Sequence, residues 1–357
     1  MNKWYVDVGP DSDTVISSRV RLARNFSKYP FPQRSRPEQQ WSVINDTCEA
    51  LFEGNPKLKE SFELYTLKDV SPIERQVLVE KHLISKELAE SSLVAAALIS
   101  HDEQISIMFN EEDHLRIQCL ASGLQLDKAF DICNYLDNLI AEKVDYAFND
   151  TIGYLTSCPT NVGTGIRASL MLHLPALTMT GYIRSVLESC GKLGLAVRGL
   201  YGENTEAYGN MYQLSNQVTL GKSENDIVLS IKTIGYQIME QERRLRTELL
   251  AKNSHKLEDR IMRSYGILRF ARNLSSDEAL QRLSDIKLGI NLGLIQDLTE
   301  IDANEMILDI QPGNLQQYAG RILKPEERDV VRAEYVRSRI EKKQCGNQKE
   351  NHSVAGE

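Results

Sequence analysis

The sequence predicts an α+β fold: an antiparallel or mixed sheet flanked by helices, followed by an all-α C-terminal region. Three observations support this prediction. In the first 250 residues, short runs of alternating apolar residues, typical of half-buried strands, are mixed with stretches of helical spacing. Two strand-like runs are separated by only five residues, as in a hairpin. From about residue 255 to 341 the apolar spacing is helical throughout.

The hairpin is the clearest of these elements. Apolar residues alternate with others over 105–109 and again over 115–119, and the sequence between them is Asn-Glu-Glu-Asp-His. A helix is expected to follow, because apolar residues then recur every three or four positions. Its stripe consists of Leu126, Phe130, Cys133, Leu136, Ile140 and Val144. Further short strands are expected around 196–197 and 212–214.

Helix starts are marked by capping residues in the second half of the chain. Ser223 with Asp226 opens a long segment whose isoleucines recur at helical spacing, and its charged end, 240–246, is expected to be solvated. Ser275 is expected to cap the start of another helix, and Pro325 is suited to the first turn of a helix. These patterns predict domains at 1–254 and 255–341, and a disordered tail at 342–357.

Composition limits the class of protein. The chain has 357 residues, 41% of them hydrophobic and 26% charged, with a formal net charge of −8. This balance argues against a surface that binds nucleic acid or an anionic membrane over its whole extent. No apolar stretch reaches the roughly 20 residues of a membrane helix, and the first residues have no apolar core typical of a secretory signal.

Cysteine and histidine usage gives no indication of a metal site. The six cysteines are scattered and never form CxxC, and the six histidines form no HxH or HxxxH pair. Disulfide scaffolds and zinc sites need denser or closer spacing. The pattern is typical of reduced thiols in a cytosolic protein, with no metal held by protein side chains.

The first candidate functional segment is Ser17-Ser18-Arg19-Val20-Arg21. If it is extended, Arg19 and Arg21 point to one face and Val20 to the other. Two guanidinium groups on one face offer many planar donors to phosphate oxygens. The alternative is a polar strand face turned to solvent.

The hairpin loop places Glu111, Glu112 and Asp113 in one short turn, where their mutual repulsion needs a cation or a substrate to offset it. If the extended conformation persists into the loop, Glu112, His114 and Arg116 share a face. A carboxylate beside an arginine suits a site that holds both a cationic nucleophile and an anionic phosphate. An exposed acidic turn is the alternative.

Two glycine-containing segments follow. In Cys-Pro-Thr-Asn-Val-Gly-Thr-Gly-Ile-Arg, residues 158–167, the glycines free the backbone to approach a ligand, and Arg167 is expected in the first turn of a helix. Cys158, between the acidic loop and this arginine, is expected to have a lowered pKa, although a cysteine is more often a small buried apolar residue. The segment 198–203, Arg-Gly-Leu-Tyr-Gly-Glu, suits a mobile loop that closes over a site, or an ordinary turn.

Together, SSRVR, NEEDHLR, CPTNVGTGIR and RGLYGE resemble in order and spacing the catalytic domain of the guanidino-kinase (phosphagen kinase) family, over roughly residues 15 to 250. The segment LVEKHLIS around His82 is similar to the family segment whose histidine contacts the nucleotide. The resemblance implies the family's α+β fold, ATP with Mg²⁺, and catalytic roles for Glu112, Glu203 and Cys158. Nucleotide binding is implied for Ser17, Ser18, Arg19, Val20, Arg21, His82, Arg116, Arg167, Ala168, Ser169, Leu170, Met171, Arg198, Gly199, Leu200, Tyr201, Gly202 and Glu203.

The C-terminal region distinguishes a subfamily. Creatine and arginine kinases have a helical domain before the SSRVR element, whereas only sixteen residues precede Ser17 here. A helical region follows instead and contains Arg-Asp-Val-Val-Arg-Ala at 328–333, which resembles the bacterial protein-arginine kinases. That resemblance implies a phosphoarginine pocket of Arg328, Asp329, Arg332 and Ala333. On a helix the two arginines are one turn apart, at a cost of about 0.2–0.5 kcal/mol that a phosphoryl group would offset.

The resemblance predicts ATP-dependent phosphorylation of arginine side chains in proteins, as a mark for stress-response proteolysis. It also implies an allosteric homodimer in the bacterial cytoplasm, with an activator protein, a heat-shock repressor and the Clp unfoldase–protease as partners, and neither nucleic acid nor membrane. The alternatives are a kinase of a small free guanidino compound, a non-catalytic phosphoarginine reader or adaptor, and a plain α+β interaction protein.

Overall fold

The computed structural model describes the backbone of residues 3–199 and 207–354, and side chains as far as residue 344. These residues divide into two compact units. The first unit consists of Met1–Leu172, Ser185–Val197 and Gln213–Ile238, and the second of His173–Arg184, Arg198–Tyr212 and Met239–Glu357. The chain therefore passes between the units several times. The division at residue 254 stays a prediction.

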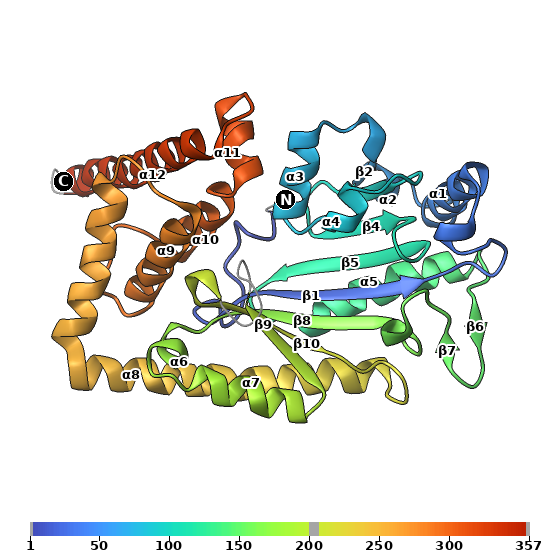
Figure 1. The fold of residues 1–357 in the computed structure, drawn as a ribbon, viewed down its shortest axis with the longest axis horizontal. Helices are drawn as coiled ribbons and strands as arrows, with labels where there is room; N and C mark the ends of the chain where they lie inside the picture. The colour runs from blue at the N-terminus through green and yellow to red at the C-terminus, as the bar shows by residue number, and fades with distance from the viewer. Residues whose placement is uncertain (1–2, 200–206, 355–357) are drawn as a thin grey trace. The chain divides into compact units, whose positions relative to one another are not determined.

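An eight-stranded sheet is the framework of the fold, in the order β2-β3-β4-β5-β1-β8-β10-β9 (Figure 1). The pairs β2–β3, β3–β4, β4–β5, β5–β1 and β1–β8 are antiparallel. The α+β prediction is thereby confirmed. The strands are β1 (Val15–Arg24), β2 (Phe62–Thr66), β3 (Ala96–Ser100), β4 (Ile105–Phe109), β5 (Leu115–Ser122), β8 (Ile166–His173), β9 (Leu195–Gly199) and β10 (Met211–Asn216), with a separate pair β6 (Phe148–Asn149) and β7 (Gly153–Tyr154).

The α-helices begin where the capping residues and prolines indicate. Ser223 and Ser275 accept hydrogen bonds from the backbone of their first turns, and Pro325 starts the last helix. The helices are α1 (Pro37–Phe52), α2 (Pro56–Glu60), α3 (Pro72–Glu80), α4 (Lys86–Ala89), α5 (Leu126–Ala141), α6 (Pro175–Met179), α7 (Ile183–Lys192), α8 (Glu224–Phe270), α9 (Ser276–Asn291), α10 (Glu300–Asp309), α11 (Pro312–Ala319) and α12 (Pro325–Val354).

The predicted hairpin is confirmed as β4 and β5 with a loop at 110–114. One face of the sheet is covered by helices. Val20 on β1 is fully buried there, and its carbonyl oxygen lies 3.5 Å from the Sγ of Cys133 on α5. Leu170 on β8 points to the same face and packs against α8. A Cβ built at Gly235 of that helix would lie only 2.5 Å from the Cδ1 of Leu170. The opposite face of β5, β1 and β8 is therefore the face that carries the arginines.

One helical expectation needs correction. The charged segment 240–246 is not wholly solvated, because Glu242 and Arg246 are buried as an ion pair at 2.7 Å. The same carboxylate accepts hydrogen bonds from the backbone N–H groups of Ala176 and Leu177 in the first turn of α6, which explains the burial of its charge.

Helix α12 extends into the tail at 342–357, as far as Val354, and the expected disorder of that tail stays a prediction. Lysine, glutamine and glutamate are good helix formers, so a helix that begins at Pro325 can extend into this stretch. At the predicted boundary, Asn253 has non-helical angles (φ −140°, ψ 38°) and kinks α8.

Among the described residues, no helix is both long and apolar enough to cross a membrane. The cysteines whose side chains are described, at 48, 119, 133, 158 and 190, are free thiols. Burial raises the pKa of the Cys133 thiol well above its ordinary value, as expected of a small apolar residue in the core.

Candidate active site

A row of polar side chains crosses the face of the sheet that carries the arginines. Ser106 on β4 pairs with Gln118 on β5, which pairs with Arg21 on β1, which in turn pairs with Arg167 on β8. Residues directly opposite each other in antiparallel strands share a face. Arg21 and Arg167 therefore point to the same side of the sheet.

Two more arginines belong to this face. Arg19 lies two residues from Arg21 along β1, and Arg116 on β5 is opposite Ala23. Alternation along a strand places both on the side of Arg21. We call Arg19, Arg21, Arg116 and Arg167 the arginine cluster. The predicted separation of arginine and valine faces along β1 is confirmed.

The arginine cluster is strongly electropositive. Burial lowers the pKa of Arg19 to about 10, and Arg116 and Arg167 act in the same direction. Burial and the other three arginines hold the pKa of Arg21 well below its ordinary value. Guanidinium groups are cations in proteins, so the four side chains repel one another. A polyanion bound between them would relieve that repulsion.

Arg167 does not lie in a helix, contrary to the prediction. It is the second residue of β8, where Ile166, Ala168 and Leu170 are buried on the other face. The alternation of this run has the strand period of two. Pairing with β1 holds this segment in the extended conformation. The glycines before it had instead suggested a loop that leads into a helix.

The glycines before β8 have positive φ angles and approach the protein's own backbone. A Cβ at Gly163 would lie 2.7 Å from the carbonyl oxygen of Thr219, and one at Gly165 would lie 2.6 Å from that of Ala23. Glycine is therefore required for packing at both positions. This close approach to the chain itself accounts for the motif without a phosphate-binding loop.

The other sequence-predicted residues of β1 and β8 divide between the two faces. Ser18, Val20, Ala168 and Leu170 are buried on the face away from the arginine cluster. The Ser18 hydroxyl donates to the carbonyl of Gly123 and accepts from the backbone of Gln125. Ser17, Ser169 and Met171 lie on the face of the cluster by register: Ser169 opposite Arg19, and Met171 opposite Ser17.

Sequence reasoning did not identify Gln213 on β10, although its Oε1 accepts a hydrogen bond of 2.9 Å from the Nη2 of Arg19. This contact fixes one arginine of the cluster across 194 residues of chain. His82, which was predicted, lies after α3 with a positive φ of 60°, and its carbonyl accepts from the Nε2 of Gln118 at 2.7 Å. His82 is thereby held over the row that contains Arg21.

The acidic loop meets the arginine cluster at Arg116. The Nη1 of Arg116 lies 2.7 Å from the Oε2 of the buried Glu111, whereas its Nη2 lies 3.9 Å from the Oε2 of Glu112. Burial raises the pKa of the Glu111 carboxyl, and Arg116 partly offsets that rise. Glu112 has a side chain 49% exposed, so it is the carboxylate with freedom to reach another molecule.

The predicted shared face of Glu112, His114 and Arg116 is wrong for His114. Asn110 has a φ of 57°, so the extended alternation ends at the first residue of the loop. His114 is fully buried, its Nδ1 accepts from the backbone of Phe26, and its Nε2 lies 2.9 Å from the carbonyl of Pro30. Burial lowers its pKa, and the ring supports the loop from beneath.

Asn25 and Asp113 join the acidic loop to the cysteine loop. The Nδ2 of Asn25 donates to the Oδ1 of Asp113 at 2.6 Å and to the carbonyl of Leu155 at 3.0 Å, and its Oδ1 accepts from the backbone of His114. The backbone N–H of Ser157 donates to the same Asp113 oxygen at 2.7 Å. Cys158 is therefore carried next to the acidic loop.

The structure describes the first two residues of the segment 198–203. Arg198 is exposed and Gly199 is the last residue of β9. Leu200, Tyr201, Gly202 and Glu203 lie outside the described residues. The expected meeting of Glu203 with Glu112 therefore stays a prediction, as does the place of Arg198.

The two arginines of the predicted phosphoarginine pocket differ in environment. Arg332 is buried on α12, where its Nε donates to the carbonyl of Ile310 and its Nη1 to the carbonyl of Leu274 and to Asp329. Ala333 is buried beside it and Arg328 is half-buried. Arg332 is thus already an integral part of the helical packing.

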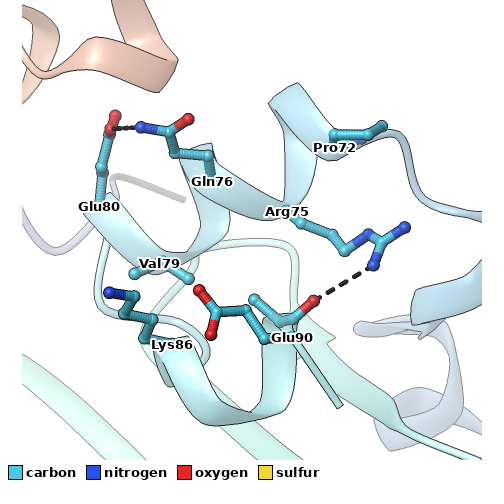
Figure 2. A pocket seen from close by; sticks show the side chains of 8 residues that line it. Pro72, Arg75, Gln76, Val79, Glu80, Lys86 and Glu90 are labelled. Atoms are coloured by element: carbon cyan, nitrogen blue, oxygen red, sulfur yellow. Dashed lines mark hydrogen bonds between the residues drawn. The ribbon is translucent and has the colours of Figure 1, made fainter. Parts of the chain in front are cut away.

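A cavity of about 490 Å³ lies between α3 and α4 (Figure 2). None of the predicted site residues lines it. Arg75, at its edge, is held by hydrogen bonds to the carbonyls of Val70 and Ala89, and Gln76 donates to Glu80. The chemistry-bearing side chains gather on the sheet instead.

Comparison with known proteins agrees with this arrangement. The model of the ATP:guanido phosphotransferase C-terminal catalytic domain matches residues 42–245, and that of the protein-arginine kinase McsB C-terminal domain matches residues 254–353. Among solved structures, a lombricine kinase aligns with a TM-score of 0.59 at 24% identity, over 68% of this chain and 71% of that one. Fold and site thus define an ATP:guanidino phosphotransferase.

Curated relatives of higher sequence identity identify the family within the ATP:guanidino phosphotransferases. A protein-arginine kinase of Geobacillus sp. (strain WCH70) is 51% identical over 346 residues, which are 95% of this chain and 94% of the relative. One of Bacillus subtilis (strain 168) is 48% identical over 99% of this chain and 97% of the relative. The chain belongs to the protein-arginine kinase family. Arg19 and Arg21 precede the matched catalytic-domain segment, so their place in the site rests on strand register.

Proposed function

We propose that this chain transfers the γ-phosphoryl group of ATP to arginine side chains of proteins. The observation that carries the proposal is the arginine cluster, with a carboxylate loop that meets it at Arg116. Cations on three neighbouring strands suit a triphosphate, and carboxylates beside them suit a guanidinium acceptor. Phosphoryl transfer needs positioning and charge stabilisation above all.

The phosphoryl transfer forms one bond and breaks one. A nitrogen of the substrate guanidinium attacks the γ-phosphorus, a P–N bond forms, and the bond from that phosphorus to the β–γ bridging oxygen breaks, which releases ADP. The nitrogen loses a proton, which we assign to the carboxylate of Glu112. Arg19, Arg21, Arg116 and Arg167, with Arg198, balance the phosphate charge.

The remaining assignments follow the family resemblance. Glu203 is the second carboxylate for the guanidinium fork, and Cys158 lies near the acceptor and tunes it without attacking. Among the described residues no group of three or more His, Cys, Asp or Glu side chains could hold a metal ion, so we assign Mg²⁺ to the phosphate oxygens.

The C-terminal helical region extends the proposal. We assign phosphoarginine binding to Arg328, Asp329, Arg332 and Ala333, where a phosphoryl group would offset the repulsion of two cations one helical turn apart. Homodimerisation, allosteric control, a cytoplasmic stress-response role, and an activator, a heat-shock repressor and the Clp unfoldase–protease as partners are proposals that rest on the family alone.

The decisive experiment incubates the purified chain with Mg-ATP and either an unfolded model protein or free arginine. We expect phosphoarginine in the protein and none from the free amino acid. Mass spectrometry must avoid acid, because the P–N bond is acid-labile. Phosphorylation of free arginine alone would identify a small-guanidino kinase, and ATP binding without any transfer would identify a non-catalytic reader.

A further inference from the structure

Trp4, near the start of the chain, carries a buried polar group without a partner. Its side chain is only 3% exposed, and its indole Nε1 has no hydrogen-bond partner among the described residues. Leaving a buried donor unsatisfied destabilises the folded state. Because buried donors are nearly always paired, such a group calls for a specific explanation.

His82 carries a second unpartnered polar atom next to it. The ring centroids of Trp4 and His82 are 6.3 Å apart, and the Nε2 of His82 is likewise buried without a partner among the described residues. The positive φ of His82 is an uncommon conformation for a residue other than glycine. Two unsatisfied nitrogens from adjacent rings therefore occupy one corner of the first unit.

This corner adjoins the arginine cluster. Gln118 holds the carbonyl of His82 and is the direct partner of Arg21 in the sheet. The cations that act on His82 are Arg19 and Arg21, whereas the acidic loop is paired with Arg116, two residues from Gln118 along β5. The phosphoryl-transfer end of the cluster is thus at Arg116, and the rings adjoin Arg19 and Arg21.

We propose that Trp4 binds the nucleobase of the nucleotide whose phosphates the arginine cluster holds, beside His82, to which the family resemblance already assigns a nucleotide contact. This inference rests on the proposed function, since it takes the cluster as a triphosphate site. A triphosphate whose terminal phosphate lies beside Arg116 and the acidic loop directs its nucleoside toward the other arginines. The new assignment is Trp4, which lies outside both segments matched by the family models.

The chemistry of both rings suits a base. The indole N–H is a donor only, so it pairs with a ring-nitrogen acceptor such as those of adenine, and either ring can stack on a base. Burial lowers the pKa of His82 to about 3, with Arg19 and Arg21 acting in the same direction, so the ring is neutral at physiological pH. A neutral imidazole offers one donor and one acceptor nitrogen.

The chain is suited to a direct test, because Trp4 and Trp41 are its only tryptophans. Trp41 lies on α1, beside Lys68 and outside the proposed machinery. In the W41F variant, fluorescence reports on Trp4 alone, and in the matched W4F variant it reports on Trp41 alone. Each is titrated with Mg-ATP and with tripolyphosphate, which has phosphates but no base, while calorimetry measures both affinities.

We expect a saturable fluorescence change in W41F with ATP but not with tripolyphosphate, and none in W4F. W4F should bind ATP about five- to tenfold more weakly than the wild type, as for one lost hydrogen bond, and tripolyphosphate equally well. ATP binding without a fluorescence change in W41F would overturn this inference, as would an unchanged ATP affinity in W4F. If W4F fails to fold, the W41F titration still decides. Absence of ATP binding to the wild type would instead overturn the proposed function.

Discussion

Arg21 on β1 and Arg167 on β8 stand directly opposite each other in an antiparallel pair. Like charges in opposed positions destabilise a sheet, and Arg19 and Arg116 add to the same positive field. The fold therefore carries an electrostatic cost in the absence of a ligand. A bound triphosphate would turn that cost into attraction. Substitution of a single arginine should therefore change the stability of the free protein and its affinity for nucleotide in opposite directions.

Replacement of Arg167 by methionine, which keeps the length of the side chain, should separate binding from stability. We expect ATP affinity to fall at least tenfold, because a cation opposite Arg21 is lost. The free energy of unfolding without nucleotide should rise by about 0.2–1 kcal/mol as repulsion is relieved. Calorimetry and thermal unfolding measure the two effects, with the exposed Arg272→Met as control. A variant that binds ATP normally would contradict the assignment.

Glu112→Gln should lower kcat by about 100-fold or more while ATP affinity stays nearly unchanged, because we assign this exposed carboxylate to the substrate guanidinium and not to the nucleotide. The matched variant is Glu111→Gln, which removes the buried partner of Arg116 instead. Steady-state kinetics with a protein substrate and nucleotide titration distinguish the two. If Glu111→Gln lost turnover and Glu112→Gln retained it, the two roles would be exchanged.

Asn25→Ala should impair both loops at once. Its amide holds Asp113, the backbone of His114 and the carbonyl of Leu155, so we expect unfolding to require about 1–3 kcal/mol less. More specifically, kcat should fall with unchanged ATP affinity, and the rate of Cys158 alkylation by iodoacetamide should change.

The control for Asn25→Ala is Thr47→Val, which removes a buried hydroxyl that donates to Val43 within α1. This variant should lose stability without a change in thiol reactivity. Equal alkylation rates in wild type and Asn25→Ala would show that Asn25 does not position the cysteine loop.

Arg328 and Arg332 should respond differently to mutation. Arg332→Ala leaves the buried carbonyls of Leu274 and Ile310 without a donor, so we expect a loss of about 2–4 kcal/mol in unfolding free energy. Arg328→Ala should leave stability nearly unchanged and weaken the binding of free phosphoarginine. Thermal unfolding and calorimetry test both, and normal phosphoarginine affinity in Arg328→Ala would exclude it from the pocket.

Local pattern was sufficient where a segment's structure depends on its own residues. Alternation along β1, β4 and β5 predicted the hairpin and the two faces of the arginine strand, and Ser223, Ser275 and Pro325 marked helix starts. Those features depend on period and capping, which neighbouring residues determine. The sequence also indicated a site for phosphate and a cationic acceptor for the same reason, because the arginines and carboxylates occur in short motifs.

Only the tertiary structure could decide which charged side chains face one another. Arg167 was assigned to a helix because its strand forms by pairing with a segment about 150 residues earlier. Glu242 was expected to be solvated, but the backbone of a distant segment binds and buries it, and carbonyls remote in the chain hold Arg332. The sequence by itself determined the class of chemistry and its local elements. The register between remote strands decided the site, because hydrogen-bond partners far apart in the chain leave no periodic trace in the sequence.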